Sequence, residues 1–271
     1  MSPNSLSRFR TSRRARTGAA LLGGGVLMGV VAGCGGTDLD SAPVERKTFA
    51  LKGEVLTVDS DNSVLKIVPA DVKDVEVARQ VDGWVFLGGG PDASWRMTDD
   101  GKLKLRFDCD ALASDCQARH TIKVPRGVEV KVRNDNGQVT ASGFTAPLEI
   151  KTENGDVSVR NTTGPLTLRS DNGDVVAKAI TAPTLTAHST NSSVRIEVKA
   201  DAAAGAVPER VEASSDNGGV TVRLPRAGAP YAVKASSGNG RVDVDVPVDK
   251  DSARVVSARS DNGHVRVRGA E

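Results

Sequence analysis

The residues of this 271-residue chain that could do chemistry are acidic side chains that recur at one spacing. Asp156 and Asp174 lie 18 positions apart, and so do Glu153 and Asp171. Paired carboxylates could cleave a glycosidic bond, or could hold a calcium ion. These positions also belong to a turn motif, where acidic side chains bond to the backbone. The turn interpretation predicts no catalytic residue and no metal site, whereas calcium binding and glycan cleavage remain alternatives.

The three histidines do not strengthen a catalytic interpretation. His120, His188 and His264 are scattered along the chain and share no spacing or position in a repeat. The chain also lacks the Gly-x-Ser-x-Gly, His-Glu-x-x-His and Walker patterns that mark common active sites. We therefore expect no enzymatic activity and no cofactor.

The first cysteine lies at the end of an export signal. Residues 1–33 carry five arginines and no acidic residue, followed by a short apolar stretch, GAALLGGGVLMGVVA. The stretch ends in Val31-Ala32-Gly33-Cys34, which resembles the bacterial lipobox. This predicts a lipoprotein signal peptide over 1–33, a lipid on Cys34 and an extracytoplasmic protein anchored in the membrane. An ordinary secretory signal is the alternative, and Arg13-Arg14 leaves the export route open.

Charge argues against a nucleic-acid partner. The whole chain has 36 basic and 34 acidic residues. Without the five leader arginines, 31 basic and 34 acidic residues remain, a net charge of −3. No run of basic residues interleaved with aromatic ones is present, so we expect no nucleic acid to bind. Residues 34–48 are polar and are predicted to be a flexible tether.

Cys109 and Cys116 are the remaining cysteines, and they lie seven positions apart between two alternating segments. In an exported domain this arrangement predicts a disulfide. Metal ligation is the alternative, although no histidine or second cysteine pair keeps zinc spacing.

An 18-residue repeat organises the rest of the chain. Each unit holds two short runs in which every second residue is apolar, the pattern of half-buried strands. An Asn-Gly pair separates the runs and a proline follows them. The predicted structural turns are Asn136-Gly137, Asn154-Gly155, Asn172-Gly173, Asn217-Gly218, Asn239-Gly240 and Asn262-Gly263, with Asn191-Ser192 as a variant. One residue is inserted after Pro183, and the next turn shifts with it.

Two all-β architectures fit this pattern. Asn-Gly between alternating runs favours hairpins, and hence an antiparallel sandwich or meander. A parallel β-solenoid explains better why identical residues recur at identical offsets, because stacked coils place like residues on like. We expect successive repeats to stack in chain order over 128–271. The segment 49–127 lacks the repeat and carries both tryptophans, Trp84 and Trp95, so it is predicted to be an irregular β cap, with an aromatic ligand platform as the alternative.

Residues 121–130 (TIKVPRGVEV), followed by Asn-Gly-Asp-Val units, resemble the bacterial putative-adhesin family of the DUF4097 type. A second, degenerate copy of the Val-Pro motif occurs at 223–226, and the resemblance extends over roughly 49–271. It implies a right-handed, single-stranded parallel β-helix without established catalytic residues. It implies no particular partner.

The sequence therefore favours a lipid-anchored envelope protein whose solenoid binds a partner without catalysis. The expected partners are the membrane, through lipidated Cys34, and an unidentified envelope glycan or protein. An accessory sensor of envelope stress and a glycan-active enzyme are the alternatives. The oligomeric state is left open.

Overall fold

The computed structural model describes residues 39–85, 91–109, 114–199, 208–225 and 230–270. The predicted signal peptide and Cys34 lie outside these ranges. Every regular element in them is a β-strand. No helix there is long and apolar enough to cross a membrane. The described part of the chain is thus all-β, as the alternating runs predicted.

The strands form two sheets, which we call sheet A and sheet B. Sheet A has 11 strands, in the spatial order β1 (Glu45–Phe49), β4 (Val75–Val85), β7 (Ser114–Pro125), β3 (Val64–Ala70), β9 (Val139–Ser142), β11 (Val157–Arg160), β13 (Val175–Ile180), β15 (Val194–Val198), β17 (Val220–Leu224), β21 (Val265–Gly269) and β19 (Val242–Asp245). Sheet B has 10 strands, in the order β18 (Ala232–Ser237), β20 (Val255–Ser260), β16 (Arg210–Ser215), β14 (Thr184–Ser189), β12 (Leu166–Ser170), β10 (Leu148–Asn154), β8 (Glu129–Asn136), β2 (Val55–Asn62), β6 (Lys102–Asp108) and β5 (Asp92–Met97).

Each repeat forms one coil, with one strand in sheet B and the next in sheet A. Neighbouring coils pair in parallel, so that Val157 lies between Val139 and Val175 in sheet A. The residue inserted after Pro183 shifts the next strand by one position, as predicted, so that Leu166 pairs with Leu185. These parallel registers confirm the β-solenoid and exclude the antiparallel meander for the repeats.

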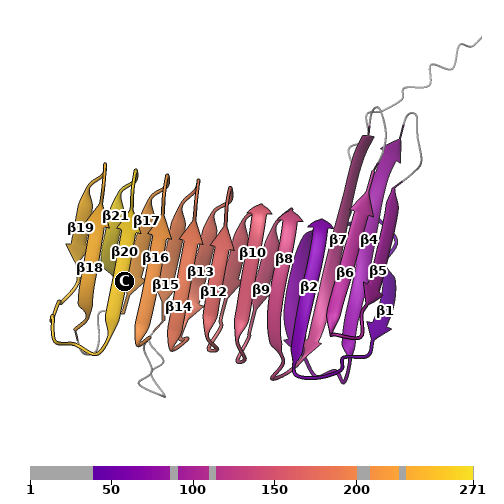
Figure 1. Ribbon diagram of the computed structural model, residues 1–271, viewed down its shortest axis with the longest axis horizontal. Coiled ribbons are helices and arrows are strands. Elements are labelled where there is room, and N and C mark those ends of the chain that lie inside the picture. The colour runs from indigo at the N-terminus through magenta and orange to yellow at the C-terminus, as the bar shows by residue number, and fades with distance from the viewer. Residues whose placement is uncertain (1–38, 86–90, 110–113, 200–207, 226–229, 271) are drawn as a thin grey trace, which may run out of the picture. The chain divides into compact units, whose positions relative to one another are not determined.

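The coils do not follow chain order at either end of the stack (Figure 1). The coil β20/β21 lies between β16/β17 and β18/β19, although it comes last in the sequence. The coil β2/β3 likewise lies between β6/β7 and β8/β9. The expectation that the repeats of 128–271 stack in chain order is therefore wrong for the last two coils. As a result, the coil nearest each terminus has neighbours on both sides.

The core is a narrow layer of aliphatic side chains between the two sheets. Strand β10 shows the rule, since Leu148 and Ile150 are fully buried while Lys151 between Ile150 and Thr152 is exposed. Valine, leucine, isoleucine and alanine fill the equivalent positions of the other coils. Stacking places these residues over one another, so each coil buries the apolar surface of its neighbours.

The cap differs from the sequence prediction in two respects. Residues 55–70, expected to be irregular, form a regular coil in which Asn62 pairs with Asn136. Residues 39–48, expected to belong to a flexible tether, are ordered by their contacts with the cap. The Gln80 side chain donates to the carbonyl of Leu39, and β1 adds to β4 as an antiparallel strand. Backbone pairing in β1 satisfies donors that a tether would leave to water.

Candidate functional site

The predicted turn asparagines form a ladder along one corner of the solenoid. Each side-chain amide donates to the side-chain oxygen of the asparagine in the next coil, over 2.7–3.0 Å. In spatial order the ladder contains Asn62, Asn136, Asn154, Asn172, Asn191, Asn217, Asn262 and Asn239. It follows the spatial order of the coils and includes Asn62, which the repeat did not predict.

The turn glycines are required by close approach between coils. A Cβ on Gly155 would lie 2.0 Å from the carbonyl oxygen of Gly137, and one on Gly173 would lie 2.2 Å from that of Gly155. Only Gly137 of the predicted turn glycines has a positive φ, of 108°. Most of these turn glycines are therefore required by the close approach of the coils and not by a positive φ.

A second ladder, inside the corner, was missed from the sequence. The Ser170 hydroxyl donates to the carbonyl of Gly155 over 2.9 Å and accepts from the amide of Gly173 over 2.8 Å. Ser189, Ser215 and Ser260 repeat this arrangement in their coils. The available signal was a small polar residue two positions before each turn asparagine. These hydroxyls satisfy backbone groups that the tight corner would otherwise bury without partners.

The candidate acidic residues serve the same corner. Asp156 accepts a hydrogen bond from the backbone amide of Asp174, and Asp174 accepts one from that of Ser193, both over 2.9 Å. Asp174 is also paired with Arg195 at 2.7 Å. Among the described residues no group of three or more His, Cys, Asp or Glu is placed to hold a metal. The carboxylates of Asp156, Asp171 and Asp174 are thus bonded to a neighbouring turn or paired with a cation.

The structure does not bring the three histidines together. His188 lies on the outer side of sheet B beside Ser214, and His264 accepts from the backbone amide of Arg241 near the opposite end from the cap. His120 is fully buried in the cap, with its ring centroid 6.4 Å from that of Trp95.

The surroundings of His120 keep it neutral. Neither ring nitrogen has a hydrogen-bond partner among the described residues. Burial, and then the positive charge of Arg79, lower the pKa of His120 to about 4. Arg79 itself stacks over Trp95 at 4.3 Å and pairs with Glu45. Trp95 is therefore part of the packing of the cap, which argues against the predicted ligand platform at this residue.

Cys109 and Cys116 form a disulfide, with their Cα atoms 6.3 Å apart. The bond lies beside the long antiparallel pair β4–β7, where Cys116 is opposite Gly83. The predicted metal alternative is therefore not needed for these cysteines. Cys34 lies outside the described residues.

The outward side chains of sheet A form a surface that sequence reasoning missed, here called the sheet-A face. It extends over β3, β9, β11, β13, β15, β17 and β21. These strands contribute seven cations and one acid, Glu197, and the adjoining edge strand β19 adds Asp243 and Asp245 beside Arg266 and Arg268. The cations are Lys66, Arg160, Lys178, Arg195, Arg223, Arg266 and Arg268. From one strand to the next they lie at least 17 residues apart in the chain, so no basic run appears in the sequence.

Shallow depressions lie along this face. One of about 430 Å³ extends from Lys66 to Arg160 over the hydroxyls of Thr140 and Ser158. A second, of about 200 Å³, lies between Lys178 and Arg223. A third, of about 700 Å³, is lined by Arg223 and Arg268 and by the acids Glu197, Asp243 and Asp245. The sheet-A face thus offers cations and hydroxyl groups over several successive coils.

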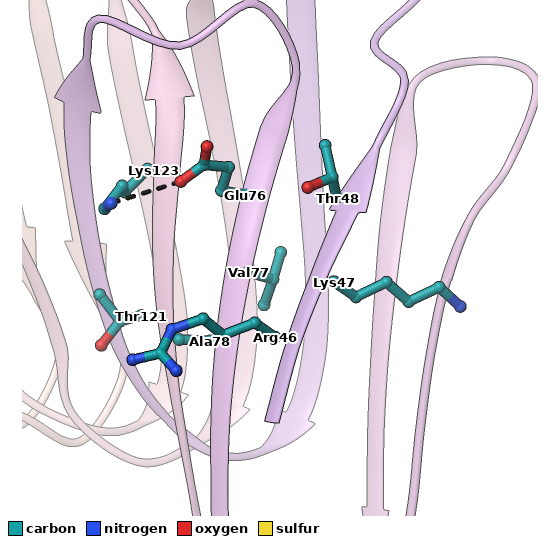
Figure 2. A pocket seen from close by; sticks show the side chains of 8 residues that line it. All are labelled: Arg46, Lys47, Thr48, Glu76, Val77, Ala78, Thr121 and Lys123. Atoms are coloured by element: carbon teal, nitrogen blue, oxygen red, sulfur yellow. Dashed lines mark hydrogen bonds and ion pairs between the residues drawn. The ribbon is translucent and has the colours of Figure 1, made fainter. Parts of the chain in front are cut away.

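A separate pocket of about 310 Å³ lies on the cap side of sheet A, between β1, β4 and β7 (Figure 2). Glu76 and Lys123 form an ion pair across it at 3.3 Å, and the Arg46 side chain extends toward Thr121. Lys47 points to the other side of β1. Because its acid is already paired with a cation, this pocket contains no free acid–base pair.

These features define a class of protein: a two-sheet parallel β-solenoid with a broad, solvent-facing candidate site. Residues 106–269 match the Toastrack DUF4097 family, and the chain belongs to that family. No curated protein matches it.

Three solved structures are similar to this chain, and the first of them shares its fold. A putative adhesin from Bacteroides fragilis NCTC 9343 is 18% identical with a TM-score of 0.51, over 85% of this chain and 98% of that one. A putative cell adhesion protein from Clostridium sporogenes ATCC 15579 is 12% identical with a TM-score of 0.35, over 84% of this chain and 100% of that one. A putative adhesin from Parabacteroides merdae ATCC 43184 is 11% identical with a TM-score of 0.35, over 85% of this chain and 98% of that one.

Proposed function

We propose that this protein is an exported, non-catalytic binding module. A lipid on Cys34 anchors it in the membrane, and the sheet-A face binds a glycan or protein of the cell envelope. The signal pattern of residues 1–33 supports export, and the names of the solved structures that share its fold agree with a role in adhesion. Neither of these supports identifies the ligand.

The observation that carries the proposal is the contrast between acids and cations in the solenoid. Asp156 and Asp174 bond to the turns of neighbouring coils, so they are poor candidates for acid–base catalysis. Lys178 and Arg223, in contrast, are exposed and have no polar partner among the described residues. A surface of unpaired cations beside shallow depressions is suited to binding and has no geometry for bond cleavage.

Binding is tested with the full chain purified in detergent, on a glycan array and in pull-downs from envelope fractions. Retention of a defined glycan or protein supports the proposal. Hydrolysis of an arrayed glycan that is lost on replacing Asp156 and Asp174 together, in a folded variant, would instead establish an enzyme.

The membrane anchor is tested separately with Cys34→Ala. The variant lacks the thiol that accepts the lipid, so it should leave the membrane fraction. Mass spectrometry of the unmodified protein should find the diacylglycerol adduct on Cys34. A Cys34→Ala protein that still fractionates with membranes after a carbonate wash would refute lipid anchoring at this residue.

A further inference from the structure

We propose that the ligand of the sheet-A face is a linear anionic polymer, an envelope glycopolymer carrying a carboxylate or phosphate on each unit. The polymer extends across the strands, along the axis of the stack, and its charges meet one coil after another. This inference rests on the proposed binding function and specifies the chemistry of the ligand.

The first argument is the difference in charge between the two outer faces. On the sheet-A face only Arg195 and Arg268, of the seven cations, have an ion-pair partner among the described residues. On sheet B, the repeat strands β8, β10, β12, β16, β18 and β20 pair five of their seven cations with an acid of the same strand or the following turn. Sheet B therefore neutralises most of its own positive charge, whereas the sheet-A face leaves more positive charge for a ligand.

The second argument is the register of the unpaired cations. Arg160 lies directly beside Lys178 in the neighbouring parallel strand. Adjacent strands are about 4.8 Å apart, so this pair brings like charges close together and destabilises the sheet. An anion between the two cations removes that repulsion. Arg223, further along the face, lies beside Glu197 on one side and Arg268 on the other, and Arg268 is paired with Asp243. A polymer with charges repeating on the scale of one monomer can bind between Arg160 and Lys178 while its other charges meet the cations of neighbouring coils.

The third argument is the chemistry between the cations. Thr140 and Ser158 lie between Lys66 and Arg160, and Thr221 lies beside Arg195 in the next strand. These hydroxyls can bond to sugar hydroxyls or to the oxygens of an anionic group. The strands of this face present no aromatic residue outward in the described ranges, and single-stranded nucleic acids bind largely by stacking on aromatic side chains. The surface therefore favours a glycopolymer over a nucleic acid.

The test measures binding of the full chain in detergent to four immobilised polymers. These are polygalacturonate for carboxylates, poly(glycerol phosphate) for phosphates, neutral dextran, and a single-stranded oligonucleotide of matched charge. We expect binding to one or both anionic polymers, weakening steeply as salt rises. The first two polymers distinguish a carboxylate from a phosphate source. Oligonucleotide binding as tight as that of the glycopolymers would overturn the assignment.

Two matched triple variants locate the site. Arg160→Gln, Lys178→Gln and Arg223→Gln together remove three cations from the sheet-A face and should weaken binding roughly ten-fold or more. Arg133→Gln, Lys151→Gln and Arg169→Gln remove three stacked cations from sheet B and should change binding less than about two-fold. Equal losses in both variants would mean that net charge alone drives binding, which refutes the proposed site.

Fragments of the polymer of different lengths test, without any substitution in the protein, whether the ligand extends along the stack. Affinity for fragments of the bound polymer should rise with length until the fragment spans the cationic coils, and then level off. Saturation at the monomer would refute an extended polymer. If no anionic polymer binds but a neutral glycan or protein does, the ligand class is wrong and the binding function stands. If nothing binds in either screen, the proposed binding function and the proposed ligand class are both refuted.

Discussion

The two ends of the solenoid differ in how their apolar side chains and strand edges are covered. A stack of parallel coils exposes apolar side chains and unpaired strand edges at each end. At the cap end the antiparallel strands β1, β4 and β5 extend the sheets, and large side chains, including Phe49 and Trp95, close the interior. At the other end, here called the open end, β18 and β19 are the last described strands, and Val242 and Val244 are 45% and 40% exposed.

This difference between the two ends shows which features terminate the stack of coils. A valine coil repeats well because each coil covers the next, but the last such coil stays partly exposed. The cap ends the stack only by abandoning the repeat for bulky side chains and antiparallel pairing. Stability should therefore depend strongly on single residues in the cap and weakly on those of the open end.

The largest effect is expected from Val77→Asp in β4 of the cap. Val77 is only 1% exposed, so the carboxylate would be buried without a partner and should lower the free energy of unfolding by about 4 kcal/mol. Urea denaturation followed by far-UV circular dichroism measures the change. An unaltered denaturation midpoint would mean that the cap is not part of the cooperative fold.

Acid should destabilise the cap through His120. Its pKa is about 4 in the folded chain against 6.5 when unfolded, so the unfolded state binds a proton that the native state excludes. Stability is then full above pH 6.5 and falls by about 3 kcal/mol as the pH drops from 6.5 to 4. Below pH 4 His120 is protonated in both the folded and the unfolded state, so it causes no further loss of stability.

Urea titrations at several pH values test this prediction against two variants. His120→Leu removes the titrating group beside Arg79 and should remove most of the loss between pH 6.5 and 4. His264→Gln, at the open end, keeps His120 and should retain that loss. The same acid sensitivity in all three proteins would assign it to other groups.

The disulfide of the cap should contribute less than these buried groups. The bond closes a loop of sequence separation 7, so replacing both Cys109 and Cys116 by serine should cost about 2.5 kcal/mol through the entropy of the unfolded chain. Comparing melting of the oxidised protein with that of the double variant gives the value. A loss above that of Val77→Asp would reverse the ranking.

The smallest effect is expected at the open end. Val244→Asp places a carboxylate on a side chain that already reaches water, beside Asp243 and Asp245. We expect a loss below about 1 kcal/mol in the same urea assay. A loss equal to that of Val77→Asp would show that the open end is covered in solution, for example by a second copy of the chain.

The interior of the stack could be predicted because its constraints are local and periodic. The 18-residue spacing fixed which residues lie over one another, as in the register of Val139, Val157 and Val175. It also predicted the shift at Leu185 and which asparagines lie at the turns. The turn glycines were identified correctly, but their function was not, because the distance from Gly155 to the carbonyl of Gly137 depends on how closely the coils approach.

The ends and the surface could not be predicted in the same way. Nothing local indicates that β20/β21 pairs on both sides while β18/β19 lies outermost, since all these strands have similar alternating patterns. The pairing of β1 with β4 was hidden for another reason. Residues 45–48 are polar because they lie at a sheet edge, and this polar composition predicts a tether.

The sequence by itself determined the all-β class, the parallel repeat and the inward side of each strand, because side-chain alternation and repeat length are properties of the chain alone. Only the tertiary structure decided the order of the end coils, the burial of His120 and the sheet-A face. Each of these joins residues far apart in the chain. Arg160 and Lys178, separated by 18 positions, become neighbours only when one coil is laid on the next.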